Sequence, residues 1–370
     1  MASGISLQEV KQTTELCRYC LMCRHVCPVT DVTRNEATSP HGWGILIASV
    51  QRGLAAWNNE TVDVLYQCAD CGLCQAHCVT DQPLPLAINA SRAEVVEQQM
   101  APAIIYELRD KLQKWGNPYA APPPERVSVQ SDAALIIGMA EYLEPQAVAA
   151  AVKLLAVAGV EAMPVAICRE SAYFPNTLGL VDEARRLGQD TLDEIKQVGA
   201  KKVFVLSPGD VYTYQTIYGY LGLQWPDDLE IVEVTTFLAA QLEAGQLSFK
   251  TDTFSDYTFY DPDHTVRLPG RWAAPRKLLS AISQTPPIEL FWRKERAAPC
   301  GVSGGLSFVQ PELAAHLAQA RLDEARQRQV KTIITDDPLT LHHLKQQTQN
   351  GNSDVAISGL YELLIAHLST

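Results

Sequence analysis

The chain lacks an apolar run long enough to span a bilayer, and it also lacks an excess of positive charge. Its 370 residues include 42 Asp and Glu against 30 Lys and Arg, which gives a formal net charge of −12. A spanning helix needs about 20 mostly apolar residues, so we expect no transmembrane segment. An acidic chain without a basic stripe is a poor partner for nucleic acid, so we expect none.

Two targeting or binding signals are also missing. No G-x-G-x-x-G fingerprint occurs, so we expect this chain to bind neither FAD nor NAD. Residues 1–14 lack a basic segment followed by an apolar one, which argues against a secretory signal peptide. The apolar content of 47% is ample for a core, and the length is typical of two or three domains.

The most informative feature of the chain is its cysteine pattern. Eight of the ten cysteines form two copies of one motif. Each copy reads C-x2-C-x2-C-x3-C, the ligand run of bacterial two-cluster ferredoxins. In such a run three thiolates hold one cubane cluster and the fourth reaches across to the other. We therefore assign Cys17, Cys20, Cys23 and Cys78 to one [4Fe–4S] cluster, and Cys68, Cys71, Cys74 and Cys27 to the second.

Other uses of these cysteines fit the spacing less well. Zinc sites take four ligands in two pairs, whereas these runs divide as three plus one. His25 and His77 lie inside the runs, but with four cysteines per site we expect them to pack near the sulfurs and tune the reduction potential. Free thiolates belong in a reducing compartment, so we expect a cytoplasmic protein, with peripheral attachment to the inner face of the membrane through a partner left open.

The pattern of apolar residues changes along the chain. We expect a helical cluster domain over residues 1–100, then a helix over 103–115 and a Pro-rich linker within 101–130. From residue 131 short apolar runs alternate with helical segments, which is typical of a parallel α/β sheet. Strands are expected at 134–138, 165–168, 202–206, 258–260, 289–292 and 331–335. The order of elements repeats, so we expect two similar halves, 131–250 and 251–370.

On these motifs the chain resembles iron–sulfur electron-transfer proteins of the glycolate oxidase iron–sulfur subunit and heterodisulfide reductase type. The matching segments are residues 17–28, 66–78, 115–118, 260–264 and 299–305. The resemblance implies an α+β multidomain chain, in which a helical two-[4Fe–4S] ferredoxin domain precedes a duplicated α/β domain of the CCG, or cysteine-rich, type.

The chain departs from that family in the second part. Each family unit carries a Cys, a Cys-Cys-Gly and a Cys-Pro-x-Cys, and most of these positions hold other residues here. In the first unit they are Met139, Ile167, Cys168, Arg169, Ser207 and Asp210; in the second they are Asp263, Pro299, Cys300, Asp337 and Thr340. One thiolate per unit cannot hold a noncubane cluster, and carboxylates match iron–sulfur ligation poorly. We expect no such cluster within 131–370 and no disulfide reductase activity.

Three smaller alternatives stay open in this region. Asp263, His264, Asp336, Asp337, His342 and His343 are candidates for a metal site, although Asp residues at strand ends more often cap turns. Gly301–Gly305 suits an anion cradle or an inherited tight turn. Cys168 and Cys300 are either a redox pair or buried inert thiols.

The resemblance implies a non-catalytic electron-transfer subunit of a hetero-oligomer. Electrons would enter from a FAD-dependent dehydrogenase, of the glycolate or lactate 2-hydroxy-acid type, and leave to a quinone or an electron-transfer flavoprotein. The CCG-like domain would then be a scaffold. Two other functions remain: an enzyme with a small-molecule or metal site in the degenerate CCG cleft, and a redox-sensing or assembly protein.

Overall fold

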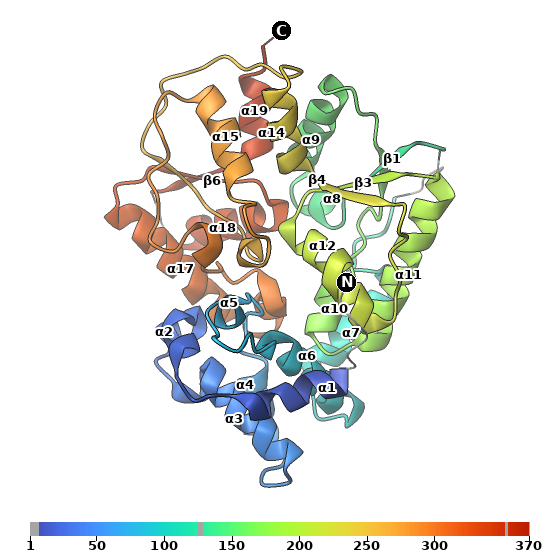
Figure 1. Ribbon diagram of the computed structural model, residues 1–370, viewed down its shortest axis with the longest axis vertical. Coiled ribbons are helices and arrows are strands. Elements are labelled where there is room, and N and C mark those ends of the chain that lie inside the picture. Colours follow the sequence, from blue (N-terminus) through green and yellow to red (C-terminus); the bar gives the residue numbers. More distant parts are fainter. Residues whose placement is uncertain (1–6, 125–128, 352–353, 370) are drawn as a thin grey trace.

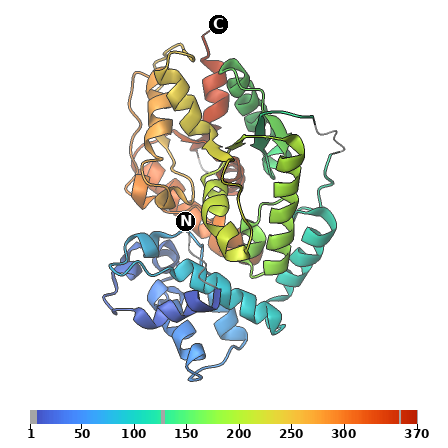
Figure 2. The ribbon, with the colours of Figure 1, turned by 45° about the vertical axis from the view of Figure 1, so that its right-hand side comes forward.

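The computed structural model describes residues 7–124, 129–351 and 354–369. A helical N-terminal domain lies below two α/β halves, which stand side by side above it (Figures 1 and 2). Two of the expected segments lie partly outside the described residues. They are the N-terminal segment without a signal peptide, at residues 1–6, and the Pro-rich linker, at residues 125–128.

The N-terminal domain consists of helices with recognisable caps. Ser39 accepts a hydrogen bond from the Gly42 N–H, and Asn58 accepts one from Thr61, so each begins a helix. These caps place the start of α3 at Pro40 and that of α4 at Asn59. The helices are α1 (Leu7–Gln12), α2 (Pro28–Thr33), α3 (Pro40–Gln51), α4 (Asn59–Leu65), α5 (Leu73–Ala76), α6 (Leu84–Glu97) and α7 (Ala103–Trp115), the last with the predicted bounds.

Both α/β halves contain a purely parallel sheet, as predicted. The first sheet has the order β2-β1-β3-β4 and the second has the order β5-β6-β7. Central strands β1 and β6 are almost wholly buried, which explains their continuous apolar sequences. The strands are β1 (Ala133–Ile136), β2 (Met163–Val165), β3 (Lys202–Val205), β4 (Glu230–Glu233), β5 (Tyr257–Phe259), β6 (Thr332–Thr335) and β7 (Ala356–Gly359).

Two strand predictions need correction. Residues 289–292 form no strand, because Pro286 and Pro287 just before them remove backbone donors and Glu289 turns to an ion pair with Arg276. One hydrogen bond remains, from the Ile288 N–H to the Tyr257 carbonyl at 2.8 Å. The strand expected at 165–168 ends at Val165, since the next residues enter a turn with left-handed backbone. Strands β4 and β7 were not anticipated.

The two halves are joined through helices at the top of Figure 1. Helix α9 (Pro145–Val157) packs on α19 (Leu360–Ala366), and α14 (Val234–Glu243) packs on α15 (Ala273–Ile282). Their apolar faces form one buried cluster between the sheets. The remaining helices are α8 (Ala140–Leu143), α10 (Tyr173–Thr177), α11 (Val181–Val198), α12 (Pro208–Tyr212), α13 (Tyr218–Leu221), α16 (Leu306–Val309), α17 (Pro311–Gln327) and α18 (Pro338–Gly351).

The N-terminal domain is fixed to the first α/β half by buried polar contacts. The guanidinium of Arg92, which is wholly buried, donates to the carbonyls of Leu65 and Cys68 and to that of Thr177. The Tyr66 hydroxyl donates to the Leu178 carbonyl at 3.0 Å. A single hydrophobic cluster runs across the same boundary. The second cysteine run is therefore held directly against the α/β part.

Candidate iron–sulfur site

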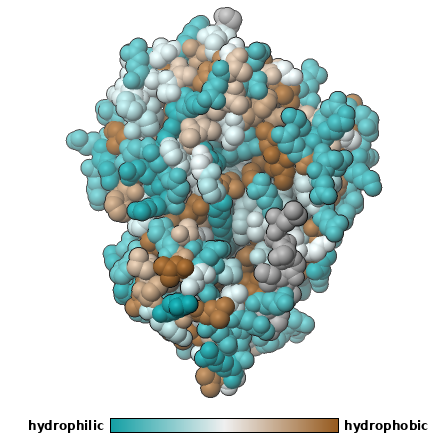
Figure 3. Space-filling model, viewed as in Figure 1, coloured by the Kyte–Doolittle hydropathy of each residue, from teal (hydrophilic) through white to brown (hydrophobic). Residues whose placement is uncertain are grey.

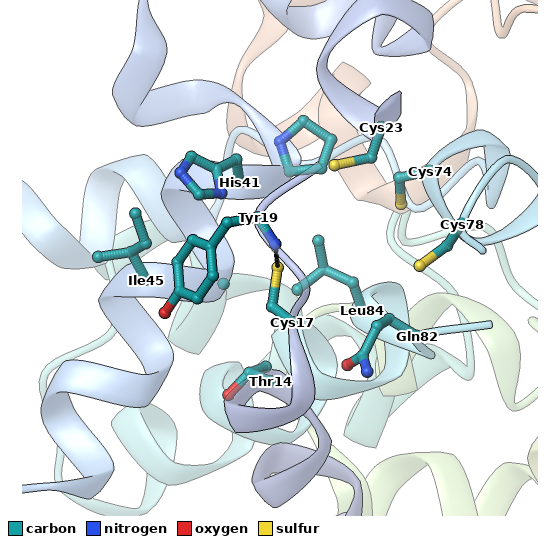
Figure 4. Close-up of a pocket in the computed structure, with 12 residues that line it drawn as sticks. Thr14, Cys17, Tyr19, Cys23, His41, Ile45, Cys74, Cys78, Gln82 and Leu84 are labelled. Atoms are coloured by element: carbon teal, nitrogen blue, oxygen red, sulfur yellow. Dashed lines mark hydrogen bonds between the residues drawn. The ribbon is translucent and has the colours of Figure 1, made fainter. Parts of the chain in front are cut away.

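The first cysteine run curls around a small cavity. Tyr19 and Leu21 adopt left-handed backbone angles, φ 55° and 61°, which bend the chain between its cysteines. Cys23, Cys74 and Cys78 lie along one side of the cavity, with Cys17 across from them (Figure 4). The Tyr19 N–H donates to the Cys17 sulfur at 3.5 Å. Residues from both cysteine runs thus meet at one place.

Electrostatic interactions identify the neighbours of Cys23. Burial, and then the charges of Cys17, Cys78 and Cys20, raise the pKa of the Cys23 thiol to about 11. Cys78 belongs to the second run, so the first three cysteines are accompanied by the fourth cysteine of the other run. Cys20 is exposed, and the other three are half-buried.

The second group lies deeper. Burial raises the pKa of the Cys71 thiol well above its usual value, and Cys27 and Cys68 add to the rise. Asp70, in a left-handed conformation, donates its N–H to the Cys68 sulfur at 3.4 Å. Cys74 interacts with Cys71, Cys68 and Cys27 and more weakly with Cys23, so it lies between the two groups.

The donor set suits iron–sulfur clusters. Burial and the neighbouring cysteines oppose ionisation of Cys23 in the first group and of Cys71 in the second while these thiols are free, and iron would take them as thiolates. A [4Fe–4S] cluster would supply one-electron redox chemistry at each position. The N–H groups of Tyr19 and Asp70 already donate to sulfur, the contact that stabilises a reduced cluster.

The loop of the second group packs against the second α/β half. Arg267 donates to Asp70 at 3.1 Å, and it also donates to the Nδ1 atom of His264 at 2.9 Å. The Ser303 hydroxyl donates to the Ala69 carbonyl at 2.7 Å. A Cβ on Gly304 would lie 2.8 Å from the Cys68 carbonyl oxygen, so this glycine permits the close approach.

Several positions expected to carry cysteine in the family come together in one cavity between the halves. They are Met139, Ser207, Asp210, Asp263 and Asp337. Asp263 accepts hydrogen bonds from Cys300 and Ser303, and Asp337 accepts two from Thr340. Two of the carboxylates therefore cap the turns around them, which explains why Asp is stable at these places.

The candidate metal ligands of this region have other partners. His342 contacts Glu144, His343 contacts the Cys300 carbonyl, and Asp336 pairs with Arg271. Within the described ranges, no three His, Cys, Asp or Glu side chains are grouped closely enough to hold a single metal ion. A [4Fe–4S] cubane is larger than a single ion, so its four thiolate ligands lie farther apart than the ligands of one ion do.

The remaining candidates in this region are structural. A Cβ on Gly301 would lie 2.7 Å from the Ala314 carbonyl oxygen, so the glycine loop packs tightly against α17. Cys168 and Cys300 are both buried, and they belong to separate hydrophobic clusters.

Comparison with known proteins agrees with the cysteine geometry. Residues 13–81 match the family described as the 4Fe-4S dicluster domain. Over 326 residues the chain is 23% identical to one subunit of the dihydromethanophenazine:CoB–CoM heterodisulfide reductase of Methanosarcina barkeri, with 82% of this chain and 78% of that one covered. The chain is therefore an iron–sulfur protein that is similar to a heterodisulfide reductase subunit over most of its length.

Two further relatives extend this comparison. A probable membrane-anchored ferredoxin of Chromohalobacter salexigens is 23% identical, over 90% of this chain and 51% of that protein. The probable iron–sulfur-binding oxidoreductase FadF of Bacillus subtilis is 23% identical, over 49% of this chain and 25% of that protein. None of the helices that the structure describes in this chain has the length and apolar character that crossing a membrane requires.

Sequence reasoning missed the residues that attach the cluster loops. Arg92, Asp70 and Arg267 contribute buried hydrogen bonds between segments far apart in the chain. The nearest signal was Asp70, a polar residue between two ligand cysteines. Its partner could not be inferred from the sequence, because the two residues are brought together only by the packing of separate domains.

Proposed function

We propose that the chain is a non-catalytic electron-transfer subunit that passes electrons through two [4Fe–4S] clusters. Cys17, Cys20, Cys23 and Cys78 hold the first cluster, and Cys68, Cys71, Cys74 and Cys27 hold the second. The observation that supports this proposal most is that Cys78 of the second run lines one cavity with Cys17 and Cys23 of the first, while Cys27 interacts with Cys71. Cys74 of the second group also interacts with Cys23 of the first, which supports electron exchange between the two clusters.

The two clusters have different surroundings, which suggests a direction. The first group reaches the surface at Cys20, whereas Cys27 and Cys68 of the second group are buried and its loop contacts the α/β part. Near the first run Leu16 is 66% exposed and Met22 is 50% exposed, and hydrophobic side chains come to the surface of the N-terminal domain (Figure 3). Exposed apolar groups beside a redox centre favour a docking face for a protein partner.

The partner we propose is a FAD-dependent dehydrogenase, with 2-hydroxy acids such as glycolate or lactate as its substrates. It would deliver electrons to the first cluster, and a quinone or an electron-transfer flavoprotein would accept them from the second. The names of the relatives, a reductase subunit and an oxidoreductase, support a role within a hetero-oligomeric complex. We place the complex in the cytoplasm, with peripheral membrane attachment through a partner.

The α/β part is proposed to be a duplicated CCG-like scaffold without a noncubane cluster. The two halves share a strand order if Ile288, which bonds to β5, is taken as the counterpart of β2, which pairs with β1. Strands β5, β6 and β7 then correspond to β1, β3 and β4. The positions that would hold a third cluster carry Met139, Ser207 and carboxylates that are engaged in hydrogen bonds. These groups support the turns and offer no set of soft ligands.

An iron count with spectroscopy tests the proposal. The protein is purified anaerobically, its iron and sulfide are counted per chain, and low-temperature EPR spectra are recorded before and after reduction. About eight irons and two interacting cubane signals are expected. About twelve irons would mean that the α/β part holds a cluster, and bound zinc with no iron would overturn the proposal.

A further inference from the structure

A cavity of about 110 Å³ lies between the two α/β halves, beside the loop of the second cysteine group. One side is aromatic, where Phe308 contacts both Phe174 and Tyr119 edge to face. The other side carries ionisable groups, and no Lys or Arg occurs among the described residues that line the cavity. These groups are Glu170, Asp210, Asp263, Asp337 and His264, with the phenols of Tyr119 and Tyr173.

His264 presents a fixed hydrogen-bond donor to this cavity. Its Nδ1 atom lies 2.9 Å from Arg267, and because a guanidinium only donates, Nδ1 must accept. The proton of the neutral ring is therefore on Nε2, which is buried and has no partner in the protein. Burial, and then the charge of Arg267, lower the pKa of His264 well below its usual value, so the ring stays neutral.

Two carboxyl groups in the cavity hold protons near neutral pH. Burial, and then the charge of Asp210, raise the pKa of Glu170 to about 8. Burial, and then the charge of Asp337, raise the pKa of Asp210 to about 7. The Oδ1 atom of Asp337 is a buried acceptor without a protein partner. The cavity thus contains two proton donors, one fixed N–H and one free acceptor.

These features restrict the ligand. Anions are disfavoured because four carboxyl groups and no cation line the cavity. The free N–H of His264 requires an acceptor atom, and the aromatic side suits a flat apolar ring. We propose that this cavity binds the head group of a quinone, with one carbonyl oxygen accepting from His264.

The position of the cavity gives such a ligand a redox role, and this step rests on the proposed function. His264 is joined through Arg267 to Asp70, and Ser303, which also lines the cavity, is joined to Ala69. Two electrons, passed singly by the clusters from the reduced flavin of the partner, and two protons, one each from Glu170 and Asp210, convert both carbonyls to hydroxyls. Both carboxylates then regain protons from water.

Binding of menadione to the anaerobically purified protein with oxidised clusters tests the proposal. Calorimetry is run on the natural chain and on two variants of the cavity. His264→Phe keeps aromatic contacts with Tyr212 and Tyr173 but removes the N–H. Ser307→Trp fills the cavity and replaces none of its acids. Each is expected to weaken binding about tenfold or more.

His343→Phe is the matched control, because His343 is also buried but bonds to the Cys300 carbonyl and lies outside the cavity lining. It is expected to bind menadione as the natural chain does. Equal affinity in all four proteins, or no binding by the natural chain, would overturn the proposal. If His264→Phe loses its iron, the menadione affinity of Ser307→Trp relative to that of the natural chain tests the proposal by itself.

Glu170→Gln separates binding from proton delivery. It is expected to bind menadione with little change but to form menadiol more slowly when its clusters are reduced with dithionite. A variant rate equal to that of the natural chain would remove Glu170 from the proton path. Iron content and the EPR signals of the clusters are measured on the same samples, so a quinone site that fails with both clusters present leaves the electron-transfer proposal standing.

Discussion

Arg267 donates a hydrogen bond to Asp70 at 3.1 Å, across 197 positions of sequence. Both side chains are nearly inaccessible, at 9% and 1% exposure. The same guanidinium lies 4.1 Å from the centre of the Tyr212 ring and bonds to His264. One side chain therefore connects the loop of the second cysteine group to both α/β halves.

Replacing Arg267 by Leu should destabilise the protein strongly. The change leaves Asp70 buried without its counter-charge, a situation that typically lowers the free energy of unfolding by about 3–5 kcal/mol. Denaturant unfolding under anaerobic conditions, followed by circular dichroism, measures the loss. Arg328→Leu is the control, because its ion pair with Glu324 is partly exposed and should contribute at most about 1 kcal/mol. Similar losses in both variants would contradict this assignment.

Arg92→Met should weaken the boundary between the N-terminal domain and the first α/β half. It leaves three buried carbonyl oxygens, those of Leu65, Cys68 and Thr177, without a strong donor. Each buried unsatisfied group costs about 1–3 kcal/mol, so a total loss of several kcal/mol is expected. Thermal unfolding measures it, with the exposed Arg109→Met as control. An unchanged melting temperature for Arg92→Met would show that water replaces the guanidinium.

The sequence was sufficient where local patterns decide the structure. Helix α7 has its predicted bounds because it ends at Gly116, a glycine in left-handed conformation. The cysteine spacing predicted a two-cluster domain, which the match of residues 13–81 to the 4Fe-4S dicluster domain supports. The strand expected at 289–292 failed because tertiary ion pairs competed with the apolar pattern, and the cavity between the halves could not be foreseen because it forms only when distant turns meet.

Cys20→Ser and Cys71→Ser should each remove one cluster. If the assignments are right, each variant retains about four irons per chain, and the EPR signal that is lost differs between them. Cys71→Ser should also lower stability more, because its group is buried and cluster binding is coupled to folding there. Cys168→Ser is the control and should keep the full iron content, because Cys168 belongs to the hydrophobic core between the two sheets. Full iron in both ligand variants would refute the assignment.

Glu170 should make the protein less stable as pH rises. Its pKa is raised from an ordinary 4.5 to about 8 in the fold, so the folded state binds more protons than the unfolded chain within that window. The contribution of Glu170 to the free energy of unfolding should therefore be fully present below pH 4.5. It should fall as the pH rises toward 8, by on the order of 4 kcal/mol for a shift of this size.

Glu170→Gln removes that contribution because glutamine does not titrate. Denaturant unfolding of both proteins between pH 5 and pH 8.5 should show a difference in stability that shifts in favour of the variant as pH rises. Glu183→Gln is a suitable control, since Glu183 is also buried but is held by Arg186 and Gln113. Parallel curves for the natural chain and Glu170→Gln would mean that the carboxyl is ionised in the folded protein, and the cavity would then lack one of its two proton donors.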